Sequence, residues 1–413
     1  MNPLYSIGIR IMSLGAKAVS LRDPKVKKII EGHKQVVPYL REHIDGKAGY
    51  VWIHAASLGE FEQGRPLIEM IKRKLPDKKI LLTFFSPSGY EVRHGYPMAD
   101  AVCYLPFDIK SRVCEFLDIV RPSMAIFVKY EFWGNYLQEL NRRGIPTYII
   151  SAIFRPTQIF FKPWGGMFRS MLKCYDKIFV QDDNSRKLLA GIGMNSVVVA
   201  GDTRFDRVTD IMRQRVDILP AEALTADKKS VTIVAGSTWE PDEEFLLPYF
   251  NSRSNVKLII APHEVRPERI AGIEKKLRRP SCRLSECTPE EAAEADCLIV
   301  DCYGMLSSAY RYGNIAYIGG GFGTGIHNVN EAAVYDMPVV FGPNFHKFKE
   351  ARDLIDCGGA FSFSDCESFA SVMDPLVGDP ARLESAGKKA GEYIKMHLGA
   401  TERIFSDIFG KNK

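Results

Sequence analysis

The sequence lacks the long apolar run that a membrane-spanning helix requires. No stretch of about 18 uncharged apolar residues occurs in the chain, so we predict no transmembrane helix. The N-terminus also lacks the cleavage pattern of a secretory signal peptide. We therefore expect neither a spanning segment nor export through a cleaved signal.

Cysteine pairs with metal-binding spacing are missing too. The nine cysteines are scattered, none forms a Cys-x-x-Cys pair, and none has a histidine at zinc spacing. The closest pairs, Cys282/Cys287 and Cys297/Cys302, show no ligand pattern. We interpret them as reduced thiols that mostly fill the core, and we predict neither a metal site nor a cofactor.

Charge of one sign is only slightly in excess. The chain has 55 Lys and Arg against 50 Asp and Glu, a formal net charge of +5. This mild excess is compatible with an anionic substrate or an anionic membrane surface, but it does not indicate nucleic acid binding. Fixed-period repeats and low-complexity tracts are also absent. The 413-residue length instead suits two folded α/β domains.

What the sequence does have is a regular alternation of short apolar runs and helical patterns. Such alternation is typical of βαβ units in parallel sheets. We therefore predict two Rossmann-like, doubly wound domains, each with its ligand crevice at the carboxyl ends of the strands. If the domains face each other, a substrate can bind in each and react in the cleft between them. The predicted strands are 51–54, 80–84, 101–105, 125–128, 147–151, 177–180, 197–200, 231–235, 256–261, 297–300, 315–318 and 338–341.

The domain boundaries are predicted from an interruption in this alternation. Residues 206–230 are polar and carry no strand pattern, so we interpret them as a linker. Residues 46–205 then form the first domain and residues 231–395 the second. The tail, residues 396–413, is predicted as a helix that could fold back over the first domain.

The N-terminal segment, residues 1–45, contains an amphipathic pattern. Apolar residues recur at helical spacing between residues 3 and 21, where Arg10 and Lys17 are the only charges. This pattern fits a helix that lies on a bilayer and equally one that packs on the protein's own core. The apolar positions are Leu4, Ile7, Ile11, Leu14 and Ala18.

Two strand-to-helix turns of the first domain carry polar side chains. The first, VWIHAASLGE (51–60), passes from a strand through Ser57 and Gly59 to a helix near Glu60. A carboxylate there can accept a proton from a substrate hydroxyl, or it can simply favour the helix dipole while Ser57 caps the helix. The second turn, TFFSPSG (83–89), places Ser86 as an N-cap before Pro87; capping and ligand contact are both open.

Two turns near the start of the second domain offer groups to an anion. Gly236, Ser237 and Thr238 follow its first predicted strand, where backbone amides and hydroxyls can meet a phosphate at a helix start. Arg266 and Arg269 follow the next strand. Their position at a strand end favours a ligand role over a role as surface charges.

A glycine-rich loop is the most specific feature of the second domain. The segment YIGGGFGTGIHNVNE (317–331) holds five glycines between residues 319 and 325 and follows a predicted strand directly. Its backbone N–H groups, those of Gly320 and Gly321 included, can cradle a phosphate, and Glu331 can accept from ribose hydroxyls. The spacing is neither a dinucleotide fingerprint nor a P-loop, and a purely structural loop is the alternative.

Taken in order, these motifs resemble those of the 3-deoxy-D-manno-octulosonic acid (Kdo) transferases of lipopolysaccharide synthesis. The resemblance covers the chain from about residue 45 to residue 395, and the shared order of the motifs makes it specific. The motifs are HAASLGE (54–60), TFFSPSG (83–89), YLPFD (104–108), EFWGN (131–135), GDTRFD (201–206), GSTWEPDEE (236–244), PHEVRPER (262–269) and HNVNEAAVYDMPVVFGP (327–343).

The resemblance implies a glycosyltransferase of the B-type fold, with two domains facing across a cleft. It implies CMP-Kdo as the donor, a lipid A precursor similar to lipid IVA as the acceptor, and transfer with inversion. Glu60 corresponds to the family's general base. An N-terminal hydrophobic segment docks family members on the inner membrane, which favours bilayer contact for residues 3–21 and a location on the cytoplasmic face.

The resemblance also implies site residues. The donor contacts are Ser237, Thr238, Arg269, Gly320, Gly321, His327, Asn328 and Glu331. The candidates for acceptor or anion contacts are Ser57, Gly59, Ser86, Glu131 and Arg204.

The chain departs from the family pattern at two of these positions. The family often has Glu-x-Glu-Leu-Trp where this chain has KYEFW (129–133), so only the second acid, Glu131, remains. Arg204 stands where the family has lysine, and arginine keeps the charge but changes the geometry. We expect Arg204 to pair with the Kdo carboxylate or with a lipid A phosphate.

Two other functions are compatible with the same fold. A nucleotide-sugar epimerase would act on the donor alone, without lipid. A non-catalytic nucleotide-sugar-binding protein at the membrane would keep its biological function after substitution of Glu60 by glutamine.

Overall fold

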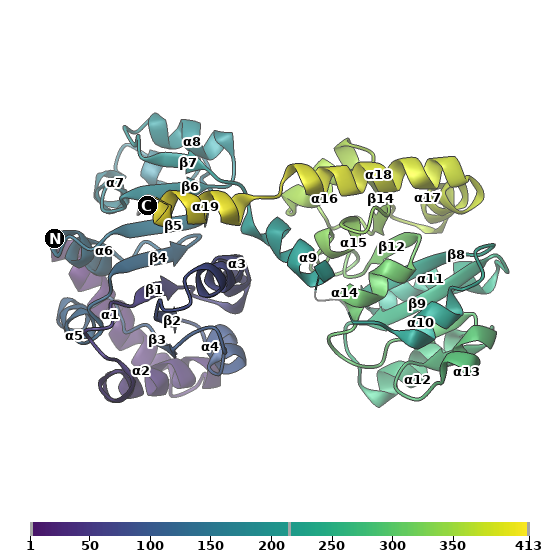
Figure 1. The fold of residues 1–413 in the computed structure, drawn as a ribbon, viewed down its shortest axis with the longest axis horizontal. Coiled ribbons are helices and arrows are strands. Elements are labelled where there is room, and N and C mark those ends of the chain that lie inside the picture. The colour runs from purple at the N-terminus through teal and green to yellow at the C-terminus, as the bar shows by residue number, and fades with distance from the viewer. Residues whose placement is uncertain (1–2, 214–215, 411–413) are drawn as a thin grey trace. The chain divides into compact units, whose positions relative to one another are not determined.

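The computed structural model describes residues 3–213 and 216–410, and the chain forms two compact units. The first comprises Met1–Arg207 and Leu398–Lys413, and the second comprises Val208–His397. Each unit is built on a seven-stranded sheet of parallel strands (Figure 1). Parallel sheets covered by helices are the basis of doubly wound α/β folds. The predicted fold class is therefore confirmed.

The sheet of the first unit has the strand order β3-β2-β1-β4-β5-β6-β7. Strand β1 pairs with β2 on one side and with β4 on the other. The direction in which successive strands are added to the sheet therefore reverses between β1 and β4, and ligands bind at such a reversal point in doubly wound sheets. The strands are β1 (Val51–His54), β2 (Ile80–Phe84), β3 (Ala101–Tyr104), β4 (Met124–Val128), β5 (Thr147–Ala152), β6 (Lys177–Val180) and β7 (Val197–Val199).

Helices cover both faces of this sheet because side chains of each strand alternate between two apolar cores. Trp52 packs with one core, while Val51 and Ile53 belong to the other, which includes Phe61 of α3 and Ile404 of α19. The helices are α1 (Pro3–Val19), α2 (Pro24–His43), α3 (Leu58–Lys74), α4 (Pro87–Arg93), α5 (Lys110–Val120), α6 (Gly134–Arg142), a 3₁₀ turn (Ile159–Phe161), α7 (Gly166–Leu172), α8 (Asp183–Ala190) and α19 (Ala400–Phe409). A further helix, α9 (Thr203–Arg213), contains the boundary between the two units.

The sheet of the second unit has the order β10-β11-β9-β8-β12-β13-β14. Its strands are β8 (Val231–Thr238), β9 (Val256–Pro262), β10 (Ser281–Arg283), β11 (Cys297–Ile299), β12 (Ile315–Ile318), β13 (Val339–Phe341) and β14 (Ala360–Ser362). Its helices are α10 (Leu219–Leu224), α11 (Glu240–Asn251), α12 (Pro267–Lys276), α13 (Pro289–Glu294), α14 (Leu306–Ala309), a 3₁₀ turn (Tyr310–Tyr312), α15 (Asn330–Ala333), α16 (Lys349–Asp356), α17 (Cys366–Gly378) and α18 (Pro380–Met396).

All twelve predicted strands are present, with ends that differ by up to three residues. The strands β10 and β14 were not predicted, and both are three-residue strands at the outer edges of the second sheet. A strand that short shows no periodicity in the sequence. The segment 206–230, predicted as a linker, holds the end of α9 and all of α10, while residues 1–2, 214–215 and 411–413 of the predicted segments lie outside the described residues.

The first helix, α1, turns its apolar face outward. Ile7, Ile11 and Leu14 have 53%, 64% and 64% of their surface exposed. The opposite face is anchored, since Tyr5 donates from its hydroxyl to Asp108 Oδ2 at 2.6 Å. No helix within residues 3–213 and 216–410 is both long and apolar enough to cross a membrane.

Candidate active site

Glu60 lies at the N-terminus of α3, directly after the carboxyl end of β1. Ser57 donates to Glu60 Oε2 from its backbone N and from its hydroxyl, at 3.0 Å in both cases. This is the reciprocal cap that often begins a helix, so the predicted capping arrangement is present. Within the described residues Glu60 Oε1 has no hydrogen-bond partner, which leaves it available for a substrate proton. Gly59 is exposed in the same turn.

Burial raises the pKa of the Glu60 carboxyl above its ordinary value. The negative charge of Glu131 raises this pKa further, while the hydrogen bond from Ser57 and the charges of His54 and Lys129 lower it. A carboxylate whose pKa is raised binds a proton more strongly and is a better general base, provided it is ionised at the working pH. The environment of Glu60 therefore suits proton abstraction.

Glu131, predicted as an acceptor or anion contact, is buried and paired inside the protein. His54 Nε2 lies 3.0 Å from Glu131 Oε2, and the Trp133 indole N–H donates to the same oxygen. The histidine is fully buried, and its Nδ1 lies 2.9 Å from the Thr83 hydroxyl. Sequence reasoning did not single out His54 as the partner of Glu131, although a histidine at the end of an otherwise apolar strand was a visible signal.

Two residues at the carboxyl edge of the same sheet have a left-handed backbone. Lys129, just after β4, has φ +73°, and Ser151 of β5 has φ +53°. Residues other than glycine rarely adopt a left-handed backbone, and such backbone strain is concentrated at functional sites. Lys129 acts electrostatically on Glu60, so this strained residue belongs to the site.

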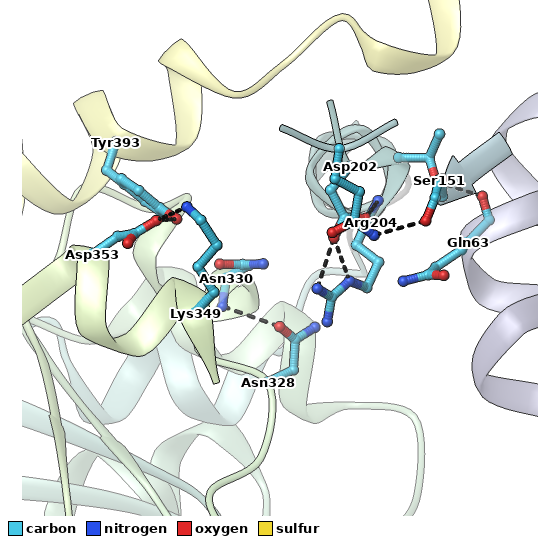
Figure 2. Close-up of polar contacts among 11 residues, drawn as sticks. Gln63, Ser151, Asp202, Arg204, Asn328, Asn330, Lys349, Asp353 and Tyr393 are labelled. Atoms are coloured by element: carbon cyan, nitrogen blue, oxygen red, sulfur yellow. Dashed lines mark hydrogen bonds and ion pairs between the residues drawn. The ribbon is translucent and has the colours of Figure 1, made fainter. Parts of the chain in front are cut away.

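Cationic side chains flank the site at Tyr130. Burial raises the pKa of the Tyr130 hydroxyl, and the positive charges of Arg155 and Arg204 oppose that rise. Arg204 donates to Asp202 Oδ2 from Nε at 2.9 Å and from Nη2 at 2.7 Å, yet its side chain stays 40% exposed (Figure 2). A guanidinium that is held in place and partly exposed can bind an anionic group.

Ser86 is the N-cap of α4, with Pro87 at the first helical position, as predicted. Its hydroxyl accepts from the backbone N of Ser88 at 3.3 Å. Ser86 thus has the capping role, and nothing in its contacts requires a ligand.

The glycine-rich loop of the second unit lines a pocket of about 450 Å³. Three flat rings stand in series there: Trp239 stacks on His263 with centroids 4.5 Å apart, and His263 on His327 at 4.6 Å. Burial lowers the pKa of His327, and nearby His263 lowers it further, which favours a neutral ring. The pocket is lined by Trp239, Pro241, Asp242, His263, Gly320, Phe322, Gly323, Thr324, Gly325 and His327.

The loop is fixed to the start of α11 by Asp242. Asp242 Oδ2 accepts from the backbone N of Trp239 and of Gly320, each at 2.9 Å. Gly320 has φ +89°, and a Cβ on Gly321 would come within 2.6 Å of the Gly342 backbone. Only glycine fits these two positions without a shift of the chain.

Thr238 and Arg269, both predicted donor contacts, meet in a buried network with Glu243. The Thr238 hydroxyl donates to Glu243 Oε1 at 3.0 Å, and Arg269 Nη1 donates to Oε2 at 2.9 Å. Arg269 is 9% exposed and Glu243 is fully buried. Ser237, next to this network, has φ +54° in β8.

Asn328 and Glu331 are joined to each other beyond the loop. Asn328 Nδ2 donates to Glu331 Oε1 at 2.9 Å, and the Ser307 hydroxyl donates to Oε2 at 2.6 Å. Asn328 Oδ1 accepts from the backbone N of Asn330 at 3.1 Å (Figure 2). Asn330 is buried, and in the described part of the chain neither polar atom of its side chain has a partner. Sequence reasoning missed Asn330, Trp239 and His263.

Known proteins with a similar sequence are transferases of one kind. A family model for 3-deoxy-D-manno-octulosonic-acid transferase (kdotransferase) matches residues 29–207. A 3-deoxy-D-manno-octulosonic acid transferase from Bordetella pertussis is 27% identical over 381 residues, which cover 87% of this chain and 87% of that protein.

Solved structures share the fold at low sequence identity. A UDP-GlcNAc 2-epimerase from Neisseria meningitidis, bound to UDP-GlcNAc, has a TM-score of 0.54 at 13% identity and covers 88% of this chain and 100% of its own. MurG from Acinetobacter baumannii has a TM-score of 0.54 at 13% identity and covers 88% and 99%. Likeness at this level shows the fold alone.

Proposed function

We propose that this chain, as a member of the Kdo transferase family of glycosyltransferases, moves Kdo from CMP-Kdo to a lipid A precursor similar to lipid IVA. The observation that carries the proposal is the position of Glu60. Its carboxyl follows a strand of the first sheet, Ser57 holds one of its oxygens, and burial raises its pKa. These are the properties required of a base that deprotonates a sugar hydroxyl.

The proposed step is an inverting displacement at the anomeric carbon of Kdo. Glu60 takes the proton of the acceptor hydroxyl, and the resulting oxygen forms a bond to the anomeric carbon. The bond from that carbon to the phosphate oxygen breaks, and CMP leaves with the electron pair. The backbone N–H of Gly320, predicted to meet the phosphate, donates to Asp242 instead, so the departing phosphate is stabilised by the N–H of Gly321 and by later N–H groups of the loop, since such dipoles act strongly in a site that excludes water.

The donor nucleotide is assigned to the pocket of the second unit. The rings of Trp239, His263 and His327 stack in series, and an aromatic face of this kind suits a nucleobase. Ser237, Asn328 and Glu331 are the candidates for polar contacts to the donor. Thr238 and Arg269 support the pocket through Glu243.

The acceptor is assigned to the first unit. Arg204 and Arg155 supply positive charge near Tyr130, which suits a lipid A phosphate or the Kdo carboxylate. Glu131 is assigned no contact with the acceptor, because its side chain is only 7% exposed. It acts on Glu60 through its charge.

A peripheral position on the cytoplasmic face of the inner membrane completes the proposal. The exposed apolar side chains of Ile7, Ile11 and Leu14 lie on one face of α1. A helix of this kind lies in the interface plane, with its apolar face among the acyl chains.

A transfer assay with matched variants tests the proposal. CMP-Kdo is generated in situ and supplied with detergent-dispersed lipid A precursor, and product is followed by mass spectrometry. Glu60→Gln should lower the rate by at least about 100-fold, because it removes the base, while CMP binding by calorimetry stays unchanged. Glu91→Gln, on the surface of α4, is the control and should keep wild-type activity.

Two results would overturn the proposal. One is the absence of any glycosylated lipid from folded, CMP-binding wild type with several acceptors. The other is full activity of Glu60→Gln. A change in the donor sugar without lipid acceptor would instead indicate an epimerase.

A further inference from the structure

We infer that the loop between β5 and α7 is a second membrane contact of the first unit, and that it inserts Trp164 among the headgroups of an anionic bilayer. This loop, residues 153–165, is called the aromatic loop below. The contact adds to the peripheral membrane position that is part of the proposed function, and it rests on that position.

The first observation is the exposure of Trp164. This residue is 73% exposed, whereas the other three tryptophans are buried or only partly exposed. An indole combines a large apolar body with a polar N–H group, and tryptophan is therefore enriched where a bilayer meets water. The interface of a bilayer accommodates both parts of such a side chain.

The aromatic loop is held in shape by Arg169 of α7. Arg169 Nη1 donates to the backbone O of Phe160 at 3.0 Å and of Lys162 at 2.9 Å. Its Nη2 donates to the backbone O of Pro163 at 3.4 Å. Three carbonyls shortly before Trp164 are thus fixed by one guanidinium. A loop that is already ordered loses little conformational entropy when it binds, so the exposed indole is presented by a preorganised backbone.

The sequence around Trp164 carries positive charge only. Residues 154–175 contain two arginines, two lysines and no Asp or Glu. Residues 3–22, which include α1, contain Arg10, Lys17 and Arg22 and again no acid. The whole chain has 50 acidic against 55 basic residues, so this excess of positive charge is local. Basic residues combined with exposed apolar side chains bind anionic lipid headgroups, which favours a lipid surface over an apolar protein partner.

Helices α1 and α7 are neighbours in the first unit. A Cβ on Gly134, the first residue of α6, would come within 2.8 Å of the Met171 side chain of α7 and within 2.9 Å of the Tyr5 ring of α1. Figure 1 shows α6 and α7 close to the N-terminal end of α1. The aromatic loop leads directly into α7. Its exposed indole and the exposed apolar face of α1 therefore belong to one region of one unit and can contact the same bilayer.

The inner side of the aromatic loop packs against the turn that carries Glu131. The ring centroids of Phe160 and Phe132 lie 4.7 Å apart, and those of Phe154 and Phe160 lie 5.7 Å apart. Phe154 and Phe160 are buried, so lipid can reach only the outer side of the loop. Insertion of Trp164 would thus join the membrane surface to a turn of the proposed active site, to which the lipid acceptor must come.

Vesicle flotation with the full chain tests the contact. The probes are vesicles of phosphatidylglycerol with phosphatidylcholine, and neutral vesicles of phosphatidylcholine alone. Trp164→Ser should bind the anionic vesicles at least about fivefold more weakly than wild type, because the loop loses its exposed apolar ring. Tyr303→Ser changes an equally exposed aromatic residue of the second unit; it is the control and should bind as wild type does. Wild type should bind the neutral vesicles more weakly than the anionic ones.

Fluorescence quenching reports where the indole lies. Brominated lipids quench a tryptophan that they contact, and they should quench part of the emission of vesicle-bound wild type. Trp164→Phe keeps an apolar ring and should still bind, but this quenching should be lost, because none of the other tryptophans is as exposed. Thermal unfolding of each variant checks that the fold is retained.

Three results would overturn the inference. Equal binding of Trp164→Ser and wild type would leave α1 as the proposed contact, and unquenched emission from vesicle-bound wild type would place the indole outside the bilayer. Equal binding of wild type to neutral and anionic vesicles would exclude the anionic surface as the partner.

Other occupants of the loop give different results. A changed oligomeric state of Trp164→Ser with intact vesicle binding would make the loop a contact between copies of the chain, and would also overturn the inference. The vesicles contain neither donor nor acceptor. The predicted vesicle results from a protein that makes no glycolipid would therefore support the membrane contact and refute the transferase proposal.

Discussion

At the scale of single residues, burial distinguishes charged side chains that support the fold from those that can contact substrate. Arg269 and Glu243 form an ion pair in the interior of the second unit, although the motif around Arg269 predicts a donor contact. The local cap of Ser57 on Glu60 could be predicted, since its partners are three residues apart. The pairs His54–Glu131 and Arg269–Glu243 join residues 77 and 26 apart, and only the tertiary packing of strands, helices and loops brings them together.

We predict that Glu243→Gln destabilises the second unit. The change removes the buried counter-charge of Arg269 and leaves only the exposed Glu240, 3.9 Å from Arg269 Nε. Breaking a buried pair in this way costs about 3–5 kcal/mol. Urea unfolding followed by circular dichroism measures the loss. Glu244→Gln, at the exposed neighbouring position, is the control and should change stability by less than about 0.5 kcal/mol. Equal stability of both variants would mean that Arg269 is free to serve a ligand.

At the scale of elements, burial determines what can be read from the sequence. Strands such as β1 and β9 are buried along their whole length and stand out as continuous apolar runs. The edge strands β10 and β14 have three residues each, most of them only partly buried, and gave no such signal. The periodicity of α1 was visible, but a helix on a bilayer and a helix on a core have the same periodicity. The exposure of Ile7, Ile11 and Leu14 shows that these side chains do not pack on the protein's own core.

We predict that α1 contributes membrane affinity through this exposed face. The triple variant Ile7→Ser, Ile11→Ser, Leu14→Ser should bind vesicles containing anionic lipid at least about tenfold more weakly than wild type, because apolar burial and basic charge supply the affinity. Vesicle flotation measures the change, and thermal unfolding should remain as in wild type. Val92→Ser replaces an equally exposed apolar residue on α4 and should leave binding unchanged. Equal binding of the triple variant would exclude α1 as the docking element.

At the scale of the whole molecule, the last helix belongs to the first unit. Asp206 accepts hydrogen bonds from the backbone N of Gly399 at 2.6 Å and of Thr401 at 2.7 Å, and from the Thr401 hydroxyl at 2.6 Å. Ile404 and Phe405 of α19 are buried in the core that also contains Phe61 of α3. The helix that begins next to the proposed base therefore packs on the end of the chain.

We predict that Asp206→Ala loosens α19 and destabilises the first unit by about 1.5–3 kcal/mol, the usual worth of hydrogen bonds to a charged group. Urea unfolding followed by tryptophan fluorescence suits the measurement, because Trp52, Trp133 and Trp164 all lie in this unit. Glu402→Gln removes the exposed ion pair of α19 with Lys74 and changes a partner of the Ser406 hydroxyl, and it should cost less than about 1 kcal/mol. Similar losses in both variants would mean that Asp206 does not anchor the helix.

The return of the chain to its first unit also constrains the order in which the protein forms during translation. Domains generally fold as they leave the ribosome, the N-terminal one first. Here the first unit consists of Met1–Arg207 and Leu398–Lys413, so its apolar core stays open until the whole second unit has been synthesised. The domain that the ribosome starts first is the one that it completes last, and the nascent chain exposes the surface beneath α19 to chaperones throughout that interval.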